Sequence, residues 1–471
     1  MKNTVVYSPA APLAMPDLDA AAAFFHSPEN TGKHWVVVSS AAVHEASHRH
    51  MGLHREEPLT PLRHGNKIAV AWRRFEKLAK ESVPAENLTI LRPTAMIGRD
   101  DALGRLFKKR WALVPPGYDP TLQLLSPEDL QKAIERASEE KRPGIFHVAP
   151  SGGVHLSAAL RAAKVRRLPL NVRHRSSDAY LRFNWTVDYQ KAREELAVEP
   201  AANEGDVFGM DEEYIGRFSR GLFRFLHDTW WRVEWRGLEH VPRQGRAVLT
   251  GVHRGFMPWD GVMALHLISR ELGRYPRFLI HPTLIKHPVI TPYILKLGGV
   301  PACRENADRI LGKDEILGIF PEGVKGAFSL YRDAYKLGRF GRDEYVKAAL
   351  RNQAPIVPFV TVGSAEVFPI LRAFHWRWFK RWSEWPFFPI TPTMGLVPLP
   401  SKWHTLFLPP MHVEREYPPE AAKDPEVVSA ISAEVQDRML HALTEMRRRR
   451  PGVFWGRIFD KDIDSLEEEW A

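Results

Sequence analysis

A chain of 471 residues is long enough for two or three domains, each with its own hydrophobic core. The composition, 44% hydrophobic and 26% charged, excludes a disordered chain, and the single cysteine, Cys303, excludes an internal disulfide bond. The net charge of +10 favours an anionic partner, which leaves nucleic acid, a membrane surface and a phosphorylated substrate open.

The first residues lack the charged-then-apolar layout of a signal peptide. The best candidate for a membrane span, residues 278–300, is interrupted by Lys286, Lys296 and several prolines. We therefore expect a cytoplasmic protein that lies on the inner face of the membrane as a peripheral protein and does not cross it.

Strands and helices alternate through the first 200 residues. Residues 35–38 (Trp-Val-Val-Val) predict a buried strand, residues 67–80 a helix, and residues 88–91 (Leu-Thr-Ile-Leu) a second strand. This alternation is typical of a parallel α/β sheet.

This part of the chain resembles the second half of an extended short-chain dehydrogenase/reductase of the nucleotide-sugar epimerase type. The resemblance covers most of residues 34–200 and implies a truncated Rossmann-like domain. It is carried by a serine segment, a Leu-Arg-Pro turn, an Asp-Leu segment and a closing helix, at 39–43, 91–98, 125–130 and 191–196.

Two departures from that family decide what the domain is expected to do. The family's catalytic tyrosine and lysine correspond here to residues 64–67, His-Gly-Asn-Lys, so the tyrosine is missing. The glycine-rich turn whose amides hold the cofactor pyrophosphate is also missing from residues 5–12. We therefore expect the domain not to bind NAD, and we expect no other resident cofactor. The histidine-rich residues 44–54 permit a metal site, but we favour a solvated loop and expect no metal.

The polar residues 199–206 are predicted to separate two domains, 1–200 and 207–455. Residues 214–231 then predict an amphipathic helix with aromatic residues and three arginines. Packing of this helix on a sheet and contact with lipid both remain open.

The second domain is organised around His253 and Asp260. A short apolar run at 247–250 predicts a buried strand, and residues 261–268 predict the start of a helix. A neutral histidine at such a turn can take a proton from an alcohol, and a carboxylate can fix its tautomer. The alternative is a structural histidine beside an aspartate that caps the helix.

Four blocks in order make residues 210–450 resemble the glycerolipid acyltransferases of the plsC type, which transfer a fatty acyl group from a thioester to a lipid hydroxyl. The strongest block is Phe-Pro-Glu-Gly at 320–323. The blocks are the His253–Asp260 turn, 298–304, 318–326 and 354–363.

The resemblance implies a catalytic pair and a set of substrate-binding residues. His253 would be the general base and Asp260 its orienting partner. Arg304 would contact a substrate phosphate, Glu322 and Gly323 would shape the acceptor pocket, and Lys325 stands where the family usually has arginine. The implied partners are an acyl-CoA or acyl carrier protein donor and a lipid acceptor.

The spacing of the first block departs from the family. Six residues separate His253 from Asp260, whereas the family most often has four. The two side chains pair only if this loop folds back on itself. Family branches with neutral acceptors, such as diacylglycerol or long-chain alcohols, look similar here, so the acceptor is left open.

Aromatic and basic residues alternate at 374–388, and a predicted helix at 425–450 ends in four arginines. Such interleaving also suits single-stranded nucleic acid, but no nucleic-acid motif accompanies it. We therefore expect an anionic membrane surface as the partner and no nucleic acid.

Three hypotheses follow. The favoured one is an acyltransferase of phospholipid or glycerolipid biosynthesis whose N-terminal domain scaffolds or docks a protein partner. The second is an active NAD-dependent epimerase or reductase with an attached lipid-binding module. The third is a non-catalytic lipid-binding scaffold.

The missing glycine-rich turn generates a first prediction. Calorimetric titration of the full-length protein with NAD(H) and NADP(H) is expected to show no measurable binding, because no backbone cradle holds the pyrophosphate. A nucleotide-sugar epimerase that binds NAD serves as the positive control. Micromolar affinity for either cofactor would revive the second hypothesis.

Overall fold

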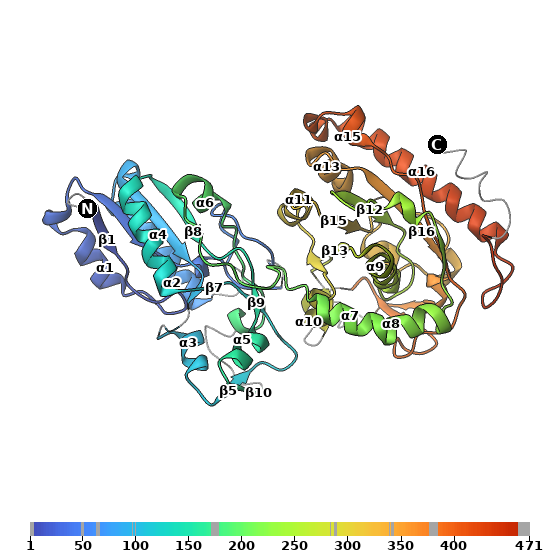
Figure 1. The fold of residues 1–471 in the computed structure, drawn as a ribbon, viewed down its shortest axis with the longest axis horizontal. Helices are drawn as coiled ribbons and strands as arrows, with labels where there is room; N and C mark the ends of the chain where they lie inside the picture. Colours follow the sequence, from blue (N-terminus) through green and yellow to red (C-terminus); the bar gives the residue numbers. More distant parts are fainter. Residues whose placement is uncertain are drawn as a thin grey trace. The chain divides into compact units, whose positions relative to one another are not determined.

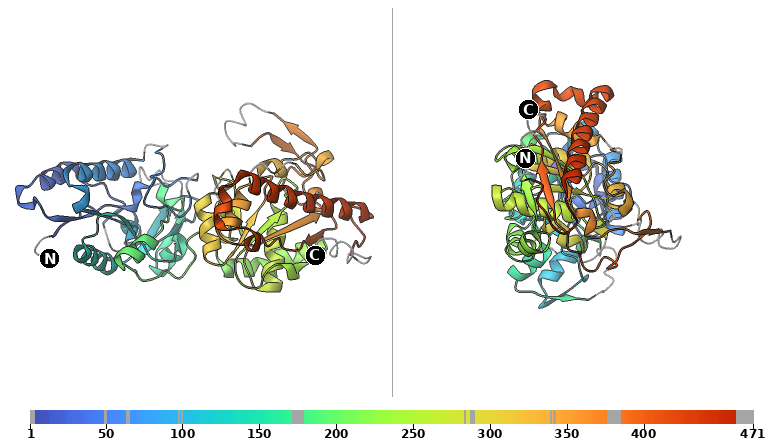
Figure 2. Two further views of the ribbon diagram at one scale, coloured as in Figure 1. Left: turned by 90° about the horizontal axis from the view of Figure 1, so that it is seen from above. Right: turned by 90° about the vertical axis from the view of Figure 1, so that its right-hand side faces the viewer.

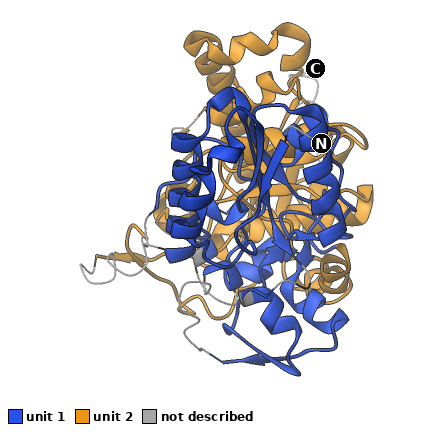
Figure 3. Cartoon of the chain, turned by 90° about the vertical axis from the view of Figure 1, so that its left-hand side faces the viewer, with its two compact units in different colours: residues 1–211, 284–296 blue, residues 212–283, 297–471 orange. Residues whose placement is uncertain are grey.

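The computed structural model describes residues 4–48, 51–62, 66–96, 98, 100–170, 179–282, 284–286, 290–338, 340, 343–375 and 385–459. The chain forms two compact units (Figure 3). Unit 1 comprises Met1–Asp211 and Leu284–Lys296, and unit 2 comprises Glu212–Thr283 and Leu297–Ala471. Each unit contains a mostly parallel sheet with helices, so the predicted α/β class with two domains is confirmed.

Unit 1 is built on a parallel sheet with the strand order β1-β2-β3-β8. The predicted strands at 35–38 and 88–91 and the predicted helix at 67–80 are confirmed as β2, β3 and α2. The strands span Thr4–Tyr7, His34–Val38, Leu88–Pro93 and Gly144–Val148, and the longer helices are α1 (Leu18–Phe25), α2 (Lys67–Ser82), α4 (Pro127–Glu140) and α6 (Gln190–Leu196). Shorter elements are β4 (Ala95–Met96), α3 (Ala102–Phe107), β5 (Trp111–Val114), β6 (Thr121–Leu122), β7 (Leu124–Leu125), β9 (Val154–His155), α5 (Leu156–Ala162) and β10 (Arg166–Pro169).

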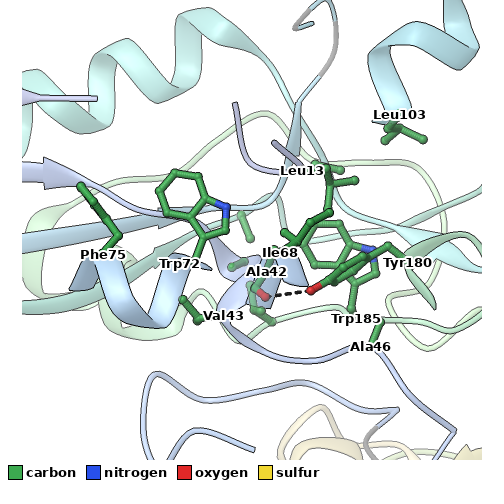
Figure 4. Close-up of a cluster of buried hydrophobic side chains, with 14 of the residues drawn as sticks. Leu13, Ala42, Val43, Ala46, Ile68, Trp72, Phe75, Leu103, Tyr180 and Trp185 are labelled. Atoms are coloured by element: carbon green, nitrogen blue, oxygen red, sulfur yellow. Dashed lines mark hydrogen bonds between the residues drawn. The ribbon is translucent and has the colours of Figure 1, made fainter. Parts of the chain in front are cut away.

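Helices cover both faces of this sheet (Figure 1). Because successive side chains of a strand point to opposite faces, Val36 and Val37 of β2 belong to different core clusters. One cluster contains Trp72 and Phe75 of α2, whose rings meet edge to face (Figure 4). The other contains Leu130 of α4. This two-faced burial is the layering of a Rossmann-like domain.

A buried ion pair lies within unit 1. The side chain of Arg92, at the end of β3, is 0% exposed, and that of Glu76 on α2 is 3% exposed. Arg92 Nε donates to Glu76 Oε1 at 2.7 Å and Nη2 donates to Oε2 at 2.6 Å. Ser39 Oγ also donates to Glu76 Oε1 at 2.6 Å. The residues that carried the epimerase resemblance, a serine and the Leu-Arg-Pro arginine, are therefore used here to join α2 to the sheet.

The expectation of a solvated histidine-rich loop is wrong for His44 and His54, which are buried. His44 is 0% exposed and His54 9% exposed, and their rings stack with centroids 4.7 Å apart. Burial is the main reason that the pKa of His44 and of its neighbour His147 lies well below the ordinary value, so both rings are neutral. Within the described ranges, no group of three or more His, Cys, Asp or Glu residues is arranged to hold a metal ion. His64 lies outside the described residues.

Unit 1 extends beyond the linker expected at 199–206. Asn203 Oδ1 accepts from the Leu124 amide at 2.8 Å, and Gly205 exchanges two backbone hydrogen bonds with Gly153. These bonds hold the polar stretch on unit 1, so the chain leaves the unit only after Asp211.

A second segment of unit 1 comes from much later in the chain. Leu284–Lys296 lies in sequence between two strands of unit 2, and its helix α10 spans Ile290–Lys296. Lys296 Nζ donates to Asp119 Oδ2 at 2.9 Å, and the Lys296 carbonyl accepts from the Asp211 amide at 3.1 Å. Lys296 is therefore bonded to two residues of unit 1, Asp119 and Asp211, that lie far from it in sequence.

Unit 2 is built on a seven-stranded sheet with the order β11-β19-β16-β12-β15-β13-β14. The five strands from β16 to β14 are parallel, and β19 is antiparallel to β16. The carboxyl ends of β16, β12 and β15 therefore meet at one edge of the sheet. The strands span Glu234–Arg236 (β11), His404–Phe407 (β19), Ile356–Val362 (β16), Ala247–Gly251 (β12), Ile316–Ile319 (β15), Arg277–Ile280 (β13) and Val300–Pro301 (β14).

Helices flank this sheet, and the long C-terminal helix predicted at 425–450 is confirmed as α16 (Pro425–Arg449). None of the helices in the described ranges is long and apolar enough to cross a membrane. The other elements are α7 (Glu212–Arg220), α8 (Leu222–Arg224), α9 (Trp259–Leu272), α11 (Arg304–Gly312), α12 (Val324–Ala327), α13 (Glu344–Arg351), α15 (Val413–Glu416) and the antiparallel hairpin of β17 (Arg372–Phe374) with β18 (Phe388–Ile390).

The helix predicted at 214–231 is interrupted. Gly221 leaves the helical region, which separates α7 from α8, and Phe225–Trp230 continues as a π-helical turn. Phe223 is fully buried, whereas Phe225 is 49% exposed. The segment therefore packs on unit 2 with one side and leaves apolar side chains exposed on another.

The Arg92–Glu76 pair generates a stability prediction. Arg92→Met is expected to lower the free energy of unfolding by about 3–5 kcal/mol, because it leaves the Glu76 carboxylate buried without its charged partner. Arg92→Met combined with Glu76→Gln is expected to recover most of that loss, since neither charge then remains buried. Denaturant unfolding of the full-length protein measures both, and equal losses in the single and double variants would contradict the account.

Candidate active site

The site begins where β12 ends, in the middle of the unit 2 sheet. All five residues of β12 are buried, and its last residue is Gly251. A Cβ at Gly251 would lie 2.3 Å from Phe359 Cζ and 2.7 Å from Phe320 Cε1, so only glycine fits between these two rings. The aromatic residues of the neighbouring strands thus close over the strand end and place the following loop at the sheet edge.

That loop carries His253 and folds back onto Asp260. His253 Nδ1 lies 2.7 Å from Asp260 Oδ2 and 3.0 Å from Oδ1, and the side chains are 11% and 0% exposed. The six-residue spacing therefore permits the pair that the sequence left in question. Because the carboxylate accepts a hydrogen bond from Nδ1–H, Nε2 is left with the lone pair that can accept a proton.

Backbone hydrogen bonds to Asp260 close the loop. Asp260 Oδ2 accepts from the Arg254 amide at 3.0 Å and Oδ1 accepts from the Gly261 amide at 2.8 Å. The helix α9 begins at Trp259 with Pro258 as its N-cap, so Asp260 is not the N-capping residue of the structural alternative. Its carboxylate is directed back to the loop that precedes the helix.

Arg254 is a residue that the sequence interpretation missed. Its Nη1 donates to Glu322 Oε2 at 2.5 Å and its Nη2 donates to Oε1 at 2.9 Å, with side chains 1% and 4% exposed. Gly338 N donates to Glu322 Oε1 at 3.0 Å. Both carboxylate oxygens of Glu322 are therefore occupied by the protein. The available signal was a charged residue of each sign close to the end of a buried strand, because buried charges require partners.

Gly323 and Lys325 continue from Glu322 into the short helix α12. Gly323 has φ +57°, a conformation that favours glycine, and it allows the turn out of β15. Lys325 is exposed to solvent. The loop of residues 252–258, which carries His253, is called the base loop below. Gly326 lies tightly against it, since a Cβ at Gly326 would be 3.0 Å from the His253 carbonyl oxygen.

Arg304 lies elsewhere on the same sheet edge. It is the first residue of α11, directly after β14, and its side chain is 62% exposed with Asp308 Oδ2 3.5 Å from Nε. The strands β12 and β14 are three places apart, which is about 14 Å at the usual strand spacing. The structure thus brings together His253, Asp260 and Glu322, and no hydrogen bond or ion pair within the described part of the chain joins them to Arg304 or Lys325.

Aromatic rings surround the outer side of the base loop. Phe256, in the middle of the loop, lies 5.7 Å from Phe328 and 5.1 Å from Trp385, centroid to centroid. Phe387, next to β18, lies 5.4 Å from Phe328. Of the aromatic residues predicted to meet a membrane, Trp376, Trp378, Phe379 and Trp382 lie outside the described residues. Trp385, from the same stretch, packs on Phe256 of the base loop.

Comparison with known proteins finds similarity over the part of the chain that contains His253 and Asp260. The family described as Acyltransferase matches residues 232–362. An uncharacterized protein of Mycobacterium tuberculosis is 37% identical over 259 residues, which cover 53% of this chain and 72% of that protein. Phytyl ester synthase 2 of Arabidopsis thaliana is 29% identical over 144 residues, covering 29% of this chain and 20% of that protein.

Two solved structures are also similar. The 1-acyl-sn-glycerophosphate acyltransferase of Thermotoga maritima shares 19% identity over 57% of this chain and 85% of its own, with a TM-score of 0.35. MoeE5, solved with UDP-glucuronic acid and NAD, shares 16% identity over 43% of this chain and 75% of its own, with a TM-score of 0.36. The chain belongs to the same family as the mycobacterial protein, and residues 232–362 are its acyltransferase domain.

Proposed function

We propose that the protein transfers a fatty acyl group from a thioester, either acyl-CoA or an acyl carrier protein, to the hydroxyl group of a lipid. The observation that carries the proposal is the buried contact between His253 Nδ1 and Asp260 Oδ2 at 2.7 Å, at the carboxyl end of a central parallel strand. The acyltransferase domain supports the same reaction class.

The pair supplies the proton transfers that this reaction needs. Nε2 of His253 takes the proton of the acceptor hydroxyl as its oxygen attacks the thioester carbonyl, and Asp260 stabilises the resulting imidazolium. When the tetrahedral intermediate collapses, the C–S bond breaks. The imidazolium then returns the proton to the leaving thiolate, so the base is regenerated with each ester formed.

The positions of the positively charged side chains near His253 affect which acceptor lipid the site can bind. Arg254, the cation adjacent to His253, is neutralised by Glu322, whereas Arg304 lies on another strand end. An acceptor phosphate would therefore be held by the exposed side chain of Arg304, which leaves a strand about 14 Å along the sheet edge from that of His253. This arrangement suits a lysophospholipid or other glycerolipid if the Arg304 side chain extends toward His253, because only a few bonds separate the hydroxyl and the phosphate of such a lipid. It equally suits a neutral alcohol, as the name of phytyl ester synthase 2 suggests.

The two other hypotheses have less support. A non-catalytic scaffold was favoured by the long spacing between His253 and Asp260, yet these side chains are in hydrogen-bond contact. An active epimerase in unit 1 lacks the expected tyrosine, and Arg92 of the Leu-Arg-Pro turn is committed to a buried ion pair with Glu76.

We also propose that the enzyme works as a peripheral protein on the cytoplasmic face of an anionic membrane. The hairpin of β17 and β18 projects from unit 2 (Figure 2). Phe374 on this hairpin is 55% exposed, and in the turn after it Leu396 is 84% and Val397 56% exposed. Exposed apolar side chains on a projecting hairpin and in the turn that follows it, in a chain with net charge +10, are suited to an anionic lipid interface.

Replacement of the base tests the reaction. His253→Ala is expected to lower turnover by about 10²–10⁴-fold, because the base is removed. Asp260→Asn is also expected to lower turnover, because the imidazole is no longer held in the required tautomer and orientation. The measurement is transfer of labelled acyl groups from acyl-CoA to a panel of lysophospholipids, diacylglycerol and fatty alcohols. His441→Ala, an exposed histidine on α16, is the matched control and is expected to leave turnover unchanged. Near-normal turnover of His253→Ala would reject the assignment.

Co-sedimentation with vesicles tests the location. Wild-type protein is expected to pellet with anionic vesicles, less at high salt, since each basic residue near the surface contributes about 1 kcal/mol that salt screens. Serine at Phe374, Leu396 and Val397 is expected to remove the binding that persists at high salt. Serine at Met15 and Leu170, exposed apolar residues of unit 1, is the control. Equal pelleting of the two variants would contradict the proposed interface.

A further inference from the structure

The guanidinium of Arg254 is held by both loops that leave the central strands of unit 2. Besides its bidentate contact with Glu322 in the loop after β15, Nη1 donates to the carbonyl of His253 at 2.8 Å. Nη2 donates to the carbonyl of Lys336 at 3.0 Å. The base loop and the Phe-Pro-Glu-Gly turn are therefore joined through one buried side chain.

The contacts fix both ends of the peptide group between His253 and Arg254. Its carbonyl oxygen accepts from Arg254 Nη1, and its amide N–H donates to Asp260 Oδ2 at 3.0 Å. The same Asp260 oxygen lies 2.7 Å from His253 Nδ1. Because both the backbone and the ring of His253 are held, the direction of Nε2 depends on Arg254 as well as on Asp260.

We propose that Arg254 is a positioning residue for acyl transfer, and that its pairing with Glu322 sets His253 against the 320–323 turn. This role rests on the proposed function of His253. It also gives Glu322 a different task from the shaping of an acceptor pocket, because both of its oxygens face Arg254 and the Gly338 amide.

The geometry requires arginine. Two parallel N–H bonds to one carboxylate need the planar fork of a guanidinium, which a lysine ammonium lacks. There is also no spare room, since a Cβ at Gly326 would lie 3.3 Å from Arg254 Nη1 and 3.0 Å from Glu322 Cβ. A smaller or differently shaped cation would leave the His253 carbonyl without its donor.

The test separates positioning from stability. Arg254→Met and Glu322→Gln each leave a buried charge without its partner, so both are expected to lower the melting temperature and turnover. The double variant buries no unpaired charge and is expected to recover the melting temperature. Its kcat is nevertheless expected to stay about 100-fold low with KM little changed, because the base is displaced. Arg254→Lys is expected to retain the charge without restoring kcat.

Unit 1 provides the matched control. Arg92 and Glu76 form an equally buried pair outside the site, so Arg92→Met with Glu76→Gln is expected to follow the same pattern in melting temperature while kcat remains that of the wild type. A double variant at Arg254 and Glu322 that regains both stability and full kcat would overturn the proposal, since the pair would then serve stability only.

A second measurement distinguishes this proposal from the proposed function. Diethyl pyrocarbonate modifies neutral imidazoles, and peptide mass spectrometry reports the rate at His253 in the full-length protein. If the wild type transfers acyl groups to none of the acceptors, the proposed function fails, and this rate decides the positioning role. Faster modification in the stable double variant supports it, and an unchanged rate overturns it.

Discussion

The carboxylate of Asp260 is the group on which the site of unit 2 depends. It accepts hydrogen bonds from His253 Nδ1–H and from two backbone amides. These bonds close the loop of six residues that lies between His253 and Asp260. A carboxylate buried to this degree is stable only when its hydrogen-bonding capacity is used. The same bonds that satisfy Asp260 therefore hold His253 in place, so the closure of the loop and the orientation of the imidazole have one cause.

The parallel sheet explains why a second loop reaches the first. Because β12 and β15 are adjacent and parallel, the residues after their carboxyl ends emerge side by side. Arg254 and Glu322, 68 residues apart in the chain, meet there as a buried ion pair. Arg304 leaves the same edge from β14 and is held apart by the intervening strands. The strand order thus keeps the His253–Asp260 pair and Arg304 at separate strand ends.

The sequence was sufficient for the strands β2, β3 and β12, for helix α2 and helix α16, and for the identity of the His253–Asp260 turn, because each rests on local periodicity or a local motif. The pairing of Arg254 with Glu322 depends on which strands are neighbours, which no local pattern contains. The burial of His44 was likewise missed, because its surroundings come from distant segments such as the strand that ends at Val148. The break at Gly221 was hidden by an apolar spacing that continues through it.

The membership of Leu284–Lys296 in unit 1 has a consequence for any dissection of the chain. The polypeptide passes from one unit to the other after Asp211, again before Leu284 and again after Lys296. A single cut after Asp211 would therefore not release two whole units. In the first fragment, the Asp119 carboxylate would lose its contact with Lys296. In the second fragment, helix α10 would lose its contacts with the rest of unit 1. The residues matched by the acyltransferase family are continuous in sequence but belong to both units, so a fragment that preserves every contact within unit 1 has to extend through Lys296 and then also carries part of unit 2.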